Sequence, residues 1–225
     1  MANEKVKKNR KFWDRYARFY DAEVLRFSGK AYAQMYCRMS KVLTKDMRVL
    51  EIATGTGLIA INIAEYVESV TATDFSPKMI AAAQKKKAPR NVWFSVEDGA
   101  DLPFVNDRFD AVVISNALHI MPDPAAVLGE IRRVLKPGGL LIAPTFSHGH
   151  IKKSAWKFNT FILKMIGFET YSKWTPEEFV SMIEENEFNV KEWVVLKAAF
   201  PLVYVEAALR SDPALSQSLL EQADV

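Results

Sequence analysis

The sequence has only one cysteine and three histidines among its 225 residues. A single thiol, Cys37, cannot form a disulfide within the chain, and this fits a reducing compartment. Two of the histidines, His148 and His150, stand two residues apart, but a metal site would need further ligands that neither cysteine nor histidine supplies. We therefore expect no metal.

No uncharged run approaches the roughly 18 residues that a membrane-spanning helix needs. Residues 1–11 are polar and basic, so no signal peptide is expected. The chain also lacks internal repeats, low-complexity tracts and a linker between domains. With 49% hydrophobic and 25% charged residues, it has the composition of a soluble globular domain, and we expect a cytoplasmic protein. The net charge of +3 permits weak attraction to anionic surfaces without requiring it.

The most informative stretch is VLEIATGTGLIAINIA, residues 49–64. It predicts a buried strand, a tight turn of small residues and then a helix with apolar faces. Gly55 and Gly57 have no Cβ atom, so a ligand can approach the backbone there, and the first N–H groups of the helix face that ligand. This pattern indicates a nucleotide-type site.

Two cofactors fit this turn. Residues 55–60 satisfy the G-x-G-x-x-A dinucleotide fingerprint, and Asp74 follows at a distance suited to holding a ribose hydroxyl. Glu51, however, lies inside the strand two residues before the turn, where a pyrophosphate gains nothing from another negative charge. S-adenosylmethionine carries an α-ammonium and a sulfonium, which favour a carboxylate. An NAD(P)-dependent oxidoreductase remains the alternative, although no tyrosine has a lysine four residues later, as a short-chain dehydrogenase would require.

From Val49 to Phe146 the chain resembles the class I S-adenosylmethionine-dependent methyltransferases, and in particular the quinone C-methyltransferase type and the methyltransferase type 11 group. Their motif I matches residues 51–57, with Ala53 where the commonest pattern has its first glycine. Asp74 and Asp98 match the acids that end strands 2 and 3. The strand 4 motif matches FDAVVISNALHIMP, and LKPGGLLIAPTF resembles the turn into strand 5.

The resemblance implies an α/β fold of the Rossmann-like type, with a seven-stranded, mostly parallel sheet, helices on both faces and a final antiparallel strand pair. It divides the chain into an N-terminal helical lid (1–45), a cofactor-binding methyltransferase domain (46–209) and a C-terminal tail (210–225). A small helical cap is expected as an insertion at 147–172. Thr175 begins a capping box and Ser76 caps a helix with proline at its first position.

The N-terminal segment is expected to form a mobile basic leader over residues 1–11, and then one helix with an aromatic stripe. A second helix is expected after Gly29. The simpler interpretation is that the stripe packs on the domain, whereas the resemblance implies a lid over the cofactor. In that lid Tyr20, or else Tyr16, would face the sulfonium through a cation–π contact. The stripe comprises Phe12, Trp13, Tyr16, Phe19 and Tyr20.

The resemblance also implies where the cofactor is held. Asp74 would bind the ribose hydroxyls, although it could instead only cap a helix, and Asp98 would read the adenine, although it could instead hold its own turn. The other implied cofactor-binding residues are Glu51, Ala53, Thr54, Gly55, Thr56 and Gly57 of motif I, Phe75, Met79, Gly99 and Ala100 around the adenine, and Ser115 and Asn116 beside the methyl group.

Methyl transfer is an in-line attack on an activated carbon, so the protein must mainly position the partners and exclude water. The product would be S-adenosylhomocysteine. An acceptor that carries a proton would benefit from a base, and His119 and Tyr20 are the candidate catalytic residues, with a structural role as the alternative for His119.

The aromatic and apolar surface of residues 12–45 and 147–172 favours a small apolar or lipid-like acceptor, with weak contact between the cap and a membrane surface. Nucleic acid is argued against, because the Asn/Asp-Pro-Pro-Tyr and Pro-Cys motifs and a basic-aromatic module are absent. A non-catalytic, cofactor-binding regulatory protein on the same fold is a further alternative. The methylated atom and the oligomeric state are left open by the sequence.

Overall fold

The computed structural model of the chain describes the backbone of residues 2–147, 170–197 and 201–210, with side chains from Asn9 onward. Its centre is an eight-stranded sheet in the order β3-β2-β1-β4-β5-β8-β6, with β7 paired to β8. Strands β1 to β5 are parallel, and β8 runs antiparallel to β5, β6 and β7. The strands are β1 (Arg48–Ile52), β2 (Ser69–Asp74), β3 (Val92–Val96), β4 (Phe109–Ile114), β5 (Leu135–Ile142), β6 (Thr145–Phe146), β7 (Phe188–Leu196) and β8 (Leu202–Leu209).

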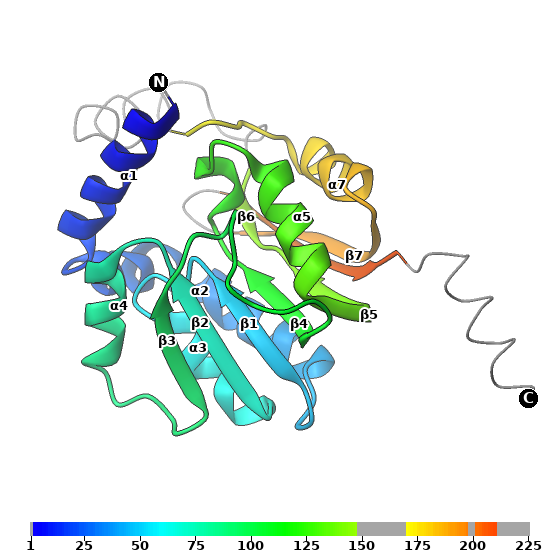
Figure 1. The fold of residues 1–225 in the computed structure, drawn as a ribbon, viewed down its shortest axis with the longest axis horizontal. Helices are drawn as coiled ribbons and strands as arrows, with labels where there is room; N and C mark the ends of the chain where they lie inside the picture. The colour runs from blue at the N-terminus through cyan, green and yellow to red at the C-terminus, as the bar shows by residue number, and fades with distance from the viewer. Residues whose placement is uncertain (1, 148–169, 198–200, 211–225) are drawn as a thin grey trace, which may run out of the picture.

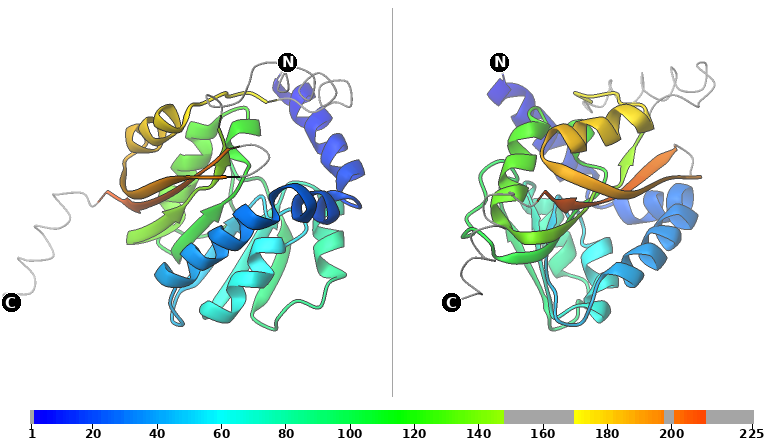
Figure 2. Two further views of the ribbon diagram at one scale, coloured as in Figure 1. Left: turned by 180° about the vertical axis from the view of Figure 1, so that it is seen from behind. Right: turned by 90° about the vertical axis from the view of Figure 1, so that its right-hand side faces the viewer.

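Helices cover both faces of the sheet (Figures 1 and 2), as expected for a doubly wound α/β fold. The buried side chains form one core with α5 and α7 and another with α2 and α3. The helices are α1 (Ala2–Tyr16), α2 (Tyr20–Val42), α3 (Leu58–Ile63), α4 (Pro77–Gln84), α5 (Pro124–Val134) and α7 (Pro176–Glu185), with short 3-10 turns η1 (Ala64–Tyr66) and η2 (Leu118–Ile120).

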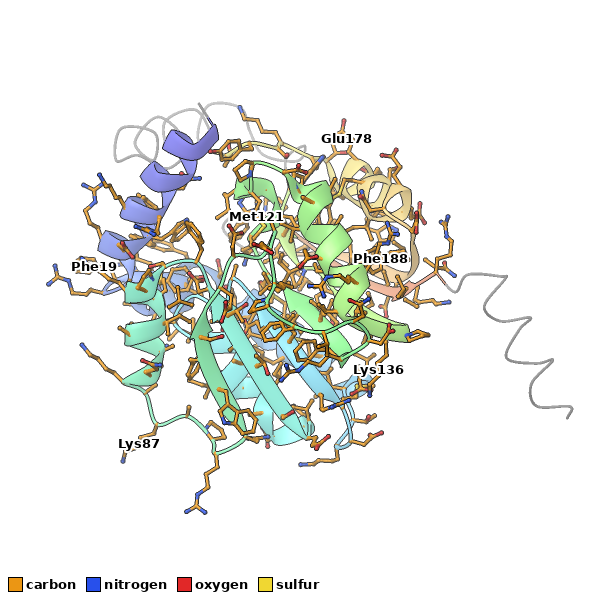
Figure 3. The ribbon with its side chains drawn as sticks, in the orientation of Figure 1. Phe19, Lys87, Met121, Lys136, Glu178 and Phe188 are labelled. Carbon is orange, nitrogen blue, oxygen red and sulfur yellow. The ribbon has the colours of Figure 1, made fainter. Side chains whose placement is uncertain are left out.

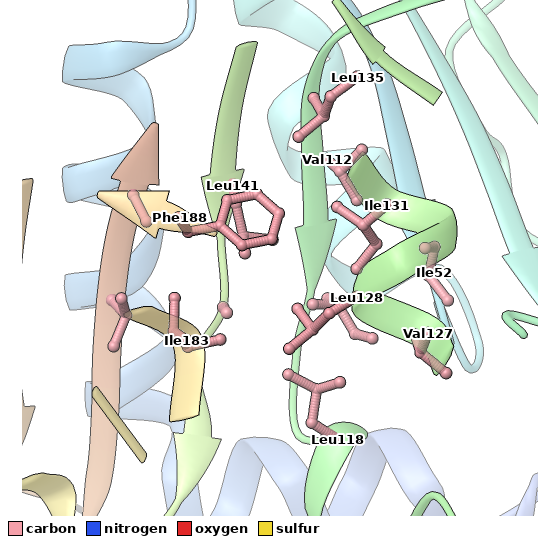
Figure 4. Close-up of a cluster of buried hydrophobic side chains, with 14 of the residues drawn as sticks. Ile52, Val112, Leu118, Val127, Leu128, Ile131, Leu135, Leu141, Ile183 and Phe188 are labelled. Atoms are coloured by element: carbon pink, nitrogen blue, oxygen red, sulfur yellow. The ribbon is translucent and has the colours of Figure 1, made fainter. Parts of the chain in front are cut away.

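In the core under α5, the residues at apolar helical spacing are those that pack against the sheet. Val127, Leu128 and Ile131 recur at helical spacing, and all three are buried. Figure 4 shows them facing Ile52 and Val112 of the sheet. Residues of β1, β4 and β5 contribute to both cores, so these central strands are buried on both sides, as their apolar runs predict.

The predicted helix caps are confirmed. The Ser76 hydroxyl accepts from the Met79 amide at 3.2 Å. Thr175 and Glu178 form the reciprocal capping box, with distances of 3.2 and 2.8 Å. Asp123 likewise accepts from the Ala126 amide at 3.0 Å, one residue before Pro124 starts α5. These contacts fix where α4, α5 and α7 begin.

The fifth strand differs from its prediction. We expected the Pro137-Gly138-Gly139 turn to end the helix and a strand to follow at 140–146. Instead α5 ends at Val134 and β5 runs from Leu135 through that turn to Ile142. Ala143 and Pro144 then separate β5 from β6, and both strands pair with β8. The predicted seven-stranded sheet therefore has eight segments, because one strand is interrupted.

The N-terminal prediction was wrong in two respects. Residues 2–11 belong to α1 and do not form an extended leader, and α2 begins at Tyr20, nine residues before Gly29. The aromatic stripe is divided by a turn, in which the Phe19 amide donates to the Tyr16 carbonyl at 2.9 Å. Glycine lowers helix propensity by only about 1 kcal/mol, so one glycine does not end a helix whose opposite face is buried. We call α1 and α2 together the N-terminal hairpin.

Candidate active site

A cavity of about 270 Å³ lies at the carboxyl ends of β1, β2 and β4 and beside the turn that follows β3. This is where ligands bind in open α/β sheets. The hairpin forms one wall of this cavity, through Asn9, Arg10 and Trp13 of α1 and Tyr20 of α2. Figure 1 shows α1 standing above this end of the sheet.

The turn after β1 lies against the cavity. Its backbone is in the left-handed region at three residues. Ala53, Gly55 and Gly57 have φ angles of 55°, 58° and 77°. A Cβ atom on Gly57 would lie 2.8 Å from the Phe94 ring, and one on Gly55 would lie 3.5 Å from the Tyr20 ring. Ala53 and Gly55 line the cavity. Gly57 therefore lets the Phe94 ring of β3 pack closely against the turn, whereas Gly55 is favoured by its positive φ angle.

Glu51 is buried behind this turn, with an exposed fraction of 1%, and it does not line the cavity. The Thr54 hydroxyl donates to its carboxyl group at 2.6 Å. Burial raises the pKa of Glu51 to about 8, against the hydrogen bond from Thr54, which lowers it. The Glu51 carboxyl group thus stabilises the turn from the side opposite the cavity. A cation placed near Glu51 would favour its ionised form.

Asp74 joins two loops at the cavity. One carboxyl oxygen accepts from the Gly55 amide and the other from the Ser76 amide, each at 2.8 Å. Burial raises the pKa of Asp74 to about 6, although these two hydrogen bonds lower it. A carboxylate has about four acceptor positions, so Asp74 can bind ligand hydroxyls in addition to both amides.

Two tyrosines and Asn116 form a hydrogen-bonded chain at the cavity wall. The Tyr20 hydroxyl is bonded to Tyr32, and the Asn116 amide group donates to the Tyr32 oxygen at 3.3 Å. Burial raises the pKa of both phenols, so both stay neutral. Asn116 has φ of 54°, a strained conformation, and its backbone N–H donates to the Pro144 carbonyl at 2.7 Å. Tyr32 could not be recognised from the sequence, because its spacing is that of an ordinary core residue.

Asp98 and its neighbours line the other end of the cavity. The Asp98 carboxyl accepts from the Ala100 amide at 3.0 Å, so it holds its own turn as well as facing the cavity. Phe75 and Met79 lie on the adjacent wall, and the Arg10 guanidinium stands 5.6 Å from the Phe75 ring centroid. A flat, apolar ligand group fits between these walls.

Most of the predicted site residues meet at this one cavity. Those that line it are Tyr20, Ala53, Gly55, Asp74, Phe75, Met79, Asp98, Gly99, Ala100, Ser115 and Asn116. Those that do not line it are Tyr16, Glu51, Thr54, Thr56 and Gly57. The Tyr16 hydroxyl donates to Glu23 and so joins α1 to α2 within the hairpin. The Thr56 hydroxyl donates to Asp21 and so joins the hairpin to the turn after β1.

His119, a predicted catalytic residue, also lies outside the cavity lining. It is buried in η2, where its Nδ1 atom is 2.9 Å from the Thr145 hydroxyl and its ring meets Phe146 edge-on. This is the structural alternative considered for it. His148 and His150 lie outside the described residues. Within the described ranges, no group of three or more metal-ligating side chains occurs.

Sequence reasoning missed several lining residues. Asn9 and Arg10 were placed in the leader, and the α1 contribution became visible only with the fold. Ser76, which also donates to Asp14 of α1 at 2.6 Å, was read only as a helix cap. The remaining missed residues lie at the end of β1, in the segments that follow β3 and β4, and in the first turn of α5; Figure 3 labels Met121 among them. They are Ile52, Glu97, Ala117, Ile120, Met121, Pro122, Asp123 and Val127.

Comparisons with known proteins agree with this geometry. A family model described as a methyltransferase domain matches residues 50–143. A demethylmenaquinone methyltransferase of Renibacterium salmoninarum is 29% identical over 153 residues, 65% of this chain and 64% of the relative. The ubiquinone/menaquinone biosynthesis C-methyltransferase UbiE of Geotalea daltonii is 29% identical over 156 residues, 63% of this chain and 66% of the relative. The matches thus span somewhat less than two thirds of these curated relatives.

Among solved structures, a DhpI–SAH complex superimposes with a TM-score of 0.73 at 21% identity, covering 95% of this chain and 100% of the other. This likeness confirms the predicted Rossmann-like fold. In the part of the chain that the structure describes, no helix is both long and apolar enough to cross a membrane.

Proposed function

Because the chain contains a class I S-adenosylmethionine-dependent methyltransferase domain, we propose that it transfers a methyl group from S-adenosylmethionine to a small apolar or amphiphilic acceptor. The observation that carries this proposal is the convergence of Gly55, Asp74, Asp98 and Asn116 on one cavity beside the buried acid Glu51. When bound, S-adenosylmethionine would supply an activated methyl group for in-line attack by the acceptor, with S-adenosylhomocysteine as the leaving group and the proton lost by the acceptor passing to water.

Each wall of the cavity has a role in this proposal. Asp74 accepts from the ribose hydroxyls, while Asp98, Phe75 and Met79 enclose the adenine. The turn from Ala53 to Gly57 holds the methionine part, and Glu51 behind it favours the α-ammonium. Ser115, Asn116 and the Tyr20 ring surround the sulfonium, which an aromatic face attracts.

His119 becomes a residue that shapes the core, and it has no catalytic role in this proposal. Its ring is engaged with Thr145 and Phe146 and does not line the cavity. The tyrosine hydroxyls are also poor bases, because burial raises their pKa. Catalysis therefore rests on positioning and on exclusion of water, which can supply most of the acceleration of an in-line displacement.

We propose a quinone-type acceptor in its reduced form, whose electron-rich ring carbon would be the attacking atom. The relatives named above support this class by their names, and the aromatic residues Trp13 and Tyr20 give the cavity a wall suited to a flat ring. The protein would act in the cytoplasm, a reducing compartment in which Cys37 stays a free thiol.

We also propose that residues 1–45 act as a lid over the 46–209 domain. Because α2 is anchored in the core through Ala31, Tyr32 and Met35, the moving part of the lid would be α1 and the turn that follows it. The polar contacts near this turn include Asp14 to Ser76, and Asp21 to Thr56 and Lys86. Such contacts can break and re-form while the core stays folded. The predicted cap (147–172) falls mostly, and the predicted tail (210–225) almost entirely, outside the described residues.

Calorimetric titration of the protein with S-adenosylmethionine, S-adenosylhomocysteine and NAD(H) tests the cofactor. We expect micromolar binding of the first two and none of the third. NAD(H) binding alone would overturn the methyltransferase assignment in favour of the oxidoreductase. Incubation with methyl-labelled cofactor and a reduced demethylmenaquinone then tests turnover, and cofactor binding without label transfer to any acceptor in a cell extract would favour the regulatory alternative.

A further inference from the structure

The N-terminal hairpin exposes three large apolar side chains within nine residues. Phe19, Leu25 and Phe27 have exposed fractions of 60%, 57% and 55%. Arg18, Arg26 and Lys30 are exposed among them. We call these six residues the hairpin patch. Single exposed apolar residues are common on proteins, but a group of them on one element indicates an interaction surface.

Arg18 and Phe19 lie in the turn before α2, and within α2 the exposed Leu25 and Phe27 flank the exposed Arg26. Farther along the helix, Ala31, Tyr32 and Met35 are buried. Figure 2 shows α2 crossing the rear of the molecule as its outer layer, and Figure 3 shows Phe19 at the outer corner beside α4. The core is therefore complete without the patch. The exposure of the three apolar side chains to water costs free energy, and a partner that buried them would remove this cost.

Charge is concentrated in the same segment. Residues 1–30 contain nine lysines or arginines and four acids, a net charge of +5, whereas the whole chain carries only +3. Three of those four acids are engaged: Asp14 with Ser76, Asp21 with Lys86 and Thr56, and Glu23 with Tyr16. No ion pair between described residues involves a cation of the patch, so its positive charge stays uncompensated.

A groove beside the hairpin turn extends this basic surface. It runs between the turn and α4 and is lined by Arg15, Arg18, Lys78, Lys85 and Lys86. Only two acids, Asp14 and Asp21, share this lining, and both are engaged as described above. The groove and the patch have Arg18 in common, so they form one continuous cationic region. Phosphate groups are the anions that such a cluster attracts.

We propose that the hairpin patch docks the protein on an anionic lipid bilayer. Phe19, Leu25 and Phe27 would enter the interface, and the surrounding cations would meet the headgroup phosphates, as in interfacial amphipathic helices. A protein partner is less favoured, because the centres of protein interfaces are depleted in lysine, whereas every apolar side chain here has a cation beside it.

The hairpin also forms one wall of the cavity through Asn9, Trp13 and Tyr20. Docking would therefore hold the cavity close to the bilayer, where a lipid-like acceptor is dissolved. This last step rests on the proposed function, whereas the docking itself does not. The surface differs from the cap at 147–172, for which the sequence suggested a weak membrane contact.

Co-sedimentation of the full-length chain with vesicles tests the docking. We would compare phosphatidylcholine vesicles with vesicles containing about 30% phosphatidylglycerol at low and high salt. We expect binding to the anionic vesicles only, weakened at least tenfold at 0.5 M salt. The combined change Phe19→Ser, Leu25→Ser, Phe27→Ser and the combined change Arg18→Glu, Arg26→Glu, Lys30→Glu should each reduce the bound fraction at least tenfold.

Trp93→Ser is the matched control, because Trp93 is equally exposed, at 56%, but lies on the edge strand β3. It should leave vesicle binding unchanged. Equal binding to neutral vesicles, no binding to anionic ones, or unchanged binding of both combined variants would overturn the proposal. Titration of every variant with S-adenosylmethionine separates the two proposals: patch-dependent vesicle binding without cofactor binding would retain the docking and reject the methyltransferase assignment.

Discussion

At the scale of single residues, two buried acids, Asp74 and Glu51, both stabilise the turn after β1. Asp74 binds the turn's Gly55 amide directly from the cavity, while Glu51 binds Thr54 from behind and never reaches the cavity. Both were identified from the sequence, Glu51 as an acid inside a buried strand just before the turn and Asp74 as the acid that ends the next strand. Only the structure separates them into a residue that faces the ligand and one that supports the loop.

Asp74→Ala should weaken S-adenosylmethionine binding roughly ten- to a hundredfold. The change removes charge-assisted hydrogen bonds, each worth about 1.5 to 3 kcal/mol, to the ribose hydroxyls. Calorimetry on the folded variant measures the loss. Asp46→Ala, which alters an exposed acid at the opposite end of β1, should leave the affinity unchanged. Equal affinity of both variants would remove Asp74 from the cofactor site.

Tyr20→Leu should weaken S-adenosylmethionine binding more than S-adenosylhomocysteine binding. Only the former carries the sulfonium, and a cation–π contact contributes about 0.5 to 2 kcal/mol, or roughly 2- to 30-fold in affinity. Tyr20→Phe keeps the ring and should keep the preference. Parallel titrations with both ligands measure the ratio, and an equal loss for the two would show that the ring acts by packing alone.

At the scale of elements, the apolar period predicted which face of each helix is buried but not where each helix starts. The caps at Ser76, Asp123 and Thr175 were readable because a side chain marks the boundary. The start of α2 was not, since Phe19 precedes it and makes no side-chain capping bond. Residues 2–11 are polar and basic, so no apolar period marked the first turns of α1.

The glycine before α3 offers a test of this element. Gly57→Ala should lower the free energy of unfolding by about 1 to 3 kcal/mol, because φ is 77° and a Cβ atom would stand 2.8 Å from Phe94. Gly129→Ala, in the exposed interior of α5 with open space around it, should raise stability by about 0.5 to 1 kcal/mol. Urea denaturation compares the two, and a loss of similar size at both positions would show that turn geometry is not the cause.

The candidate site was predicted best where motif residues end strands. Asp74, Asp98 and Asn116 meet because parallel strands place their carboxyl ends along one edge. The wall formed by Asn9, Arg10 and Trp13 comes from a helix whose contacts with the domain are distant in sequence, such as the bond from Ser76 to Asp14, 62 positions apart. Nothing in local sequence spacing predicts such a contact.

At the scale of the whole molecule, the stability of the cofactor-free protein depends on pH, because two acids are buried between the sheet and its surroundings. Burial raises the pKa of Glu51 to about 8 and that of Asp74 to about 6. The folded state therefore binds more protons than the unfolded state between about pH 4 and pH 8. Stability contributed by the protonated acids is present below pH 4 and is lost as pH rises through the folded-state pKa values.

The melting temperature of the cofactor-free protein should accordingly fall between pH 5 and pH 8. The acids with lowered pKa, Asp110 and Glu130, stay ionised in both states across this window and add no slope. Glu51→Gln should flatten the decline between about pH 7 and pH 8, where Asp74 is already largely ionised and Glu51 still titrates. A thermal denaturation series measures both curves, and a wild-type curve that rises with pH would contradict the assignment.

The hairpin is joined to the rest of the molecule by one short connection, between the end of α2 at Val42 and the start of β1 at Arg48. A recombination event within those few codons would replace the hairpin together with one wall of the cavity, and would keep the turn after β1, Asp74 and Asp98. The new segment would also have to cover the core that α2 covers through Ala31, Tyr32 and Met35. In evolutionary terms, this wall can be exchanged only for a segment with a matching apolar face.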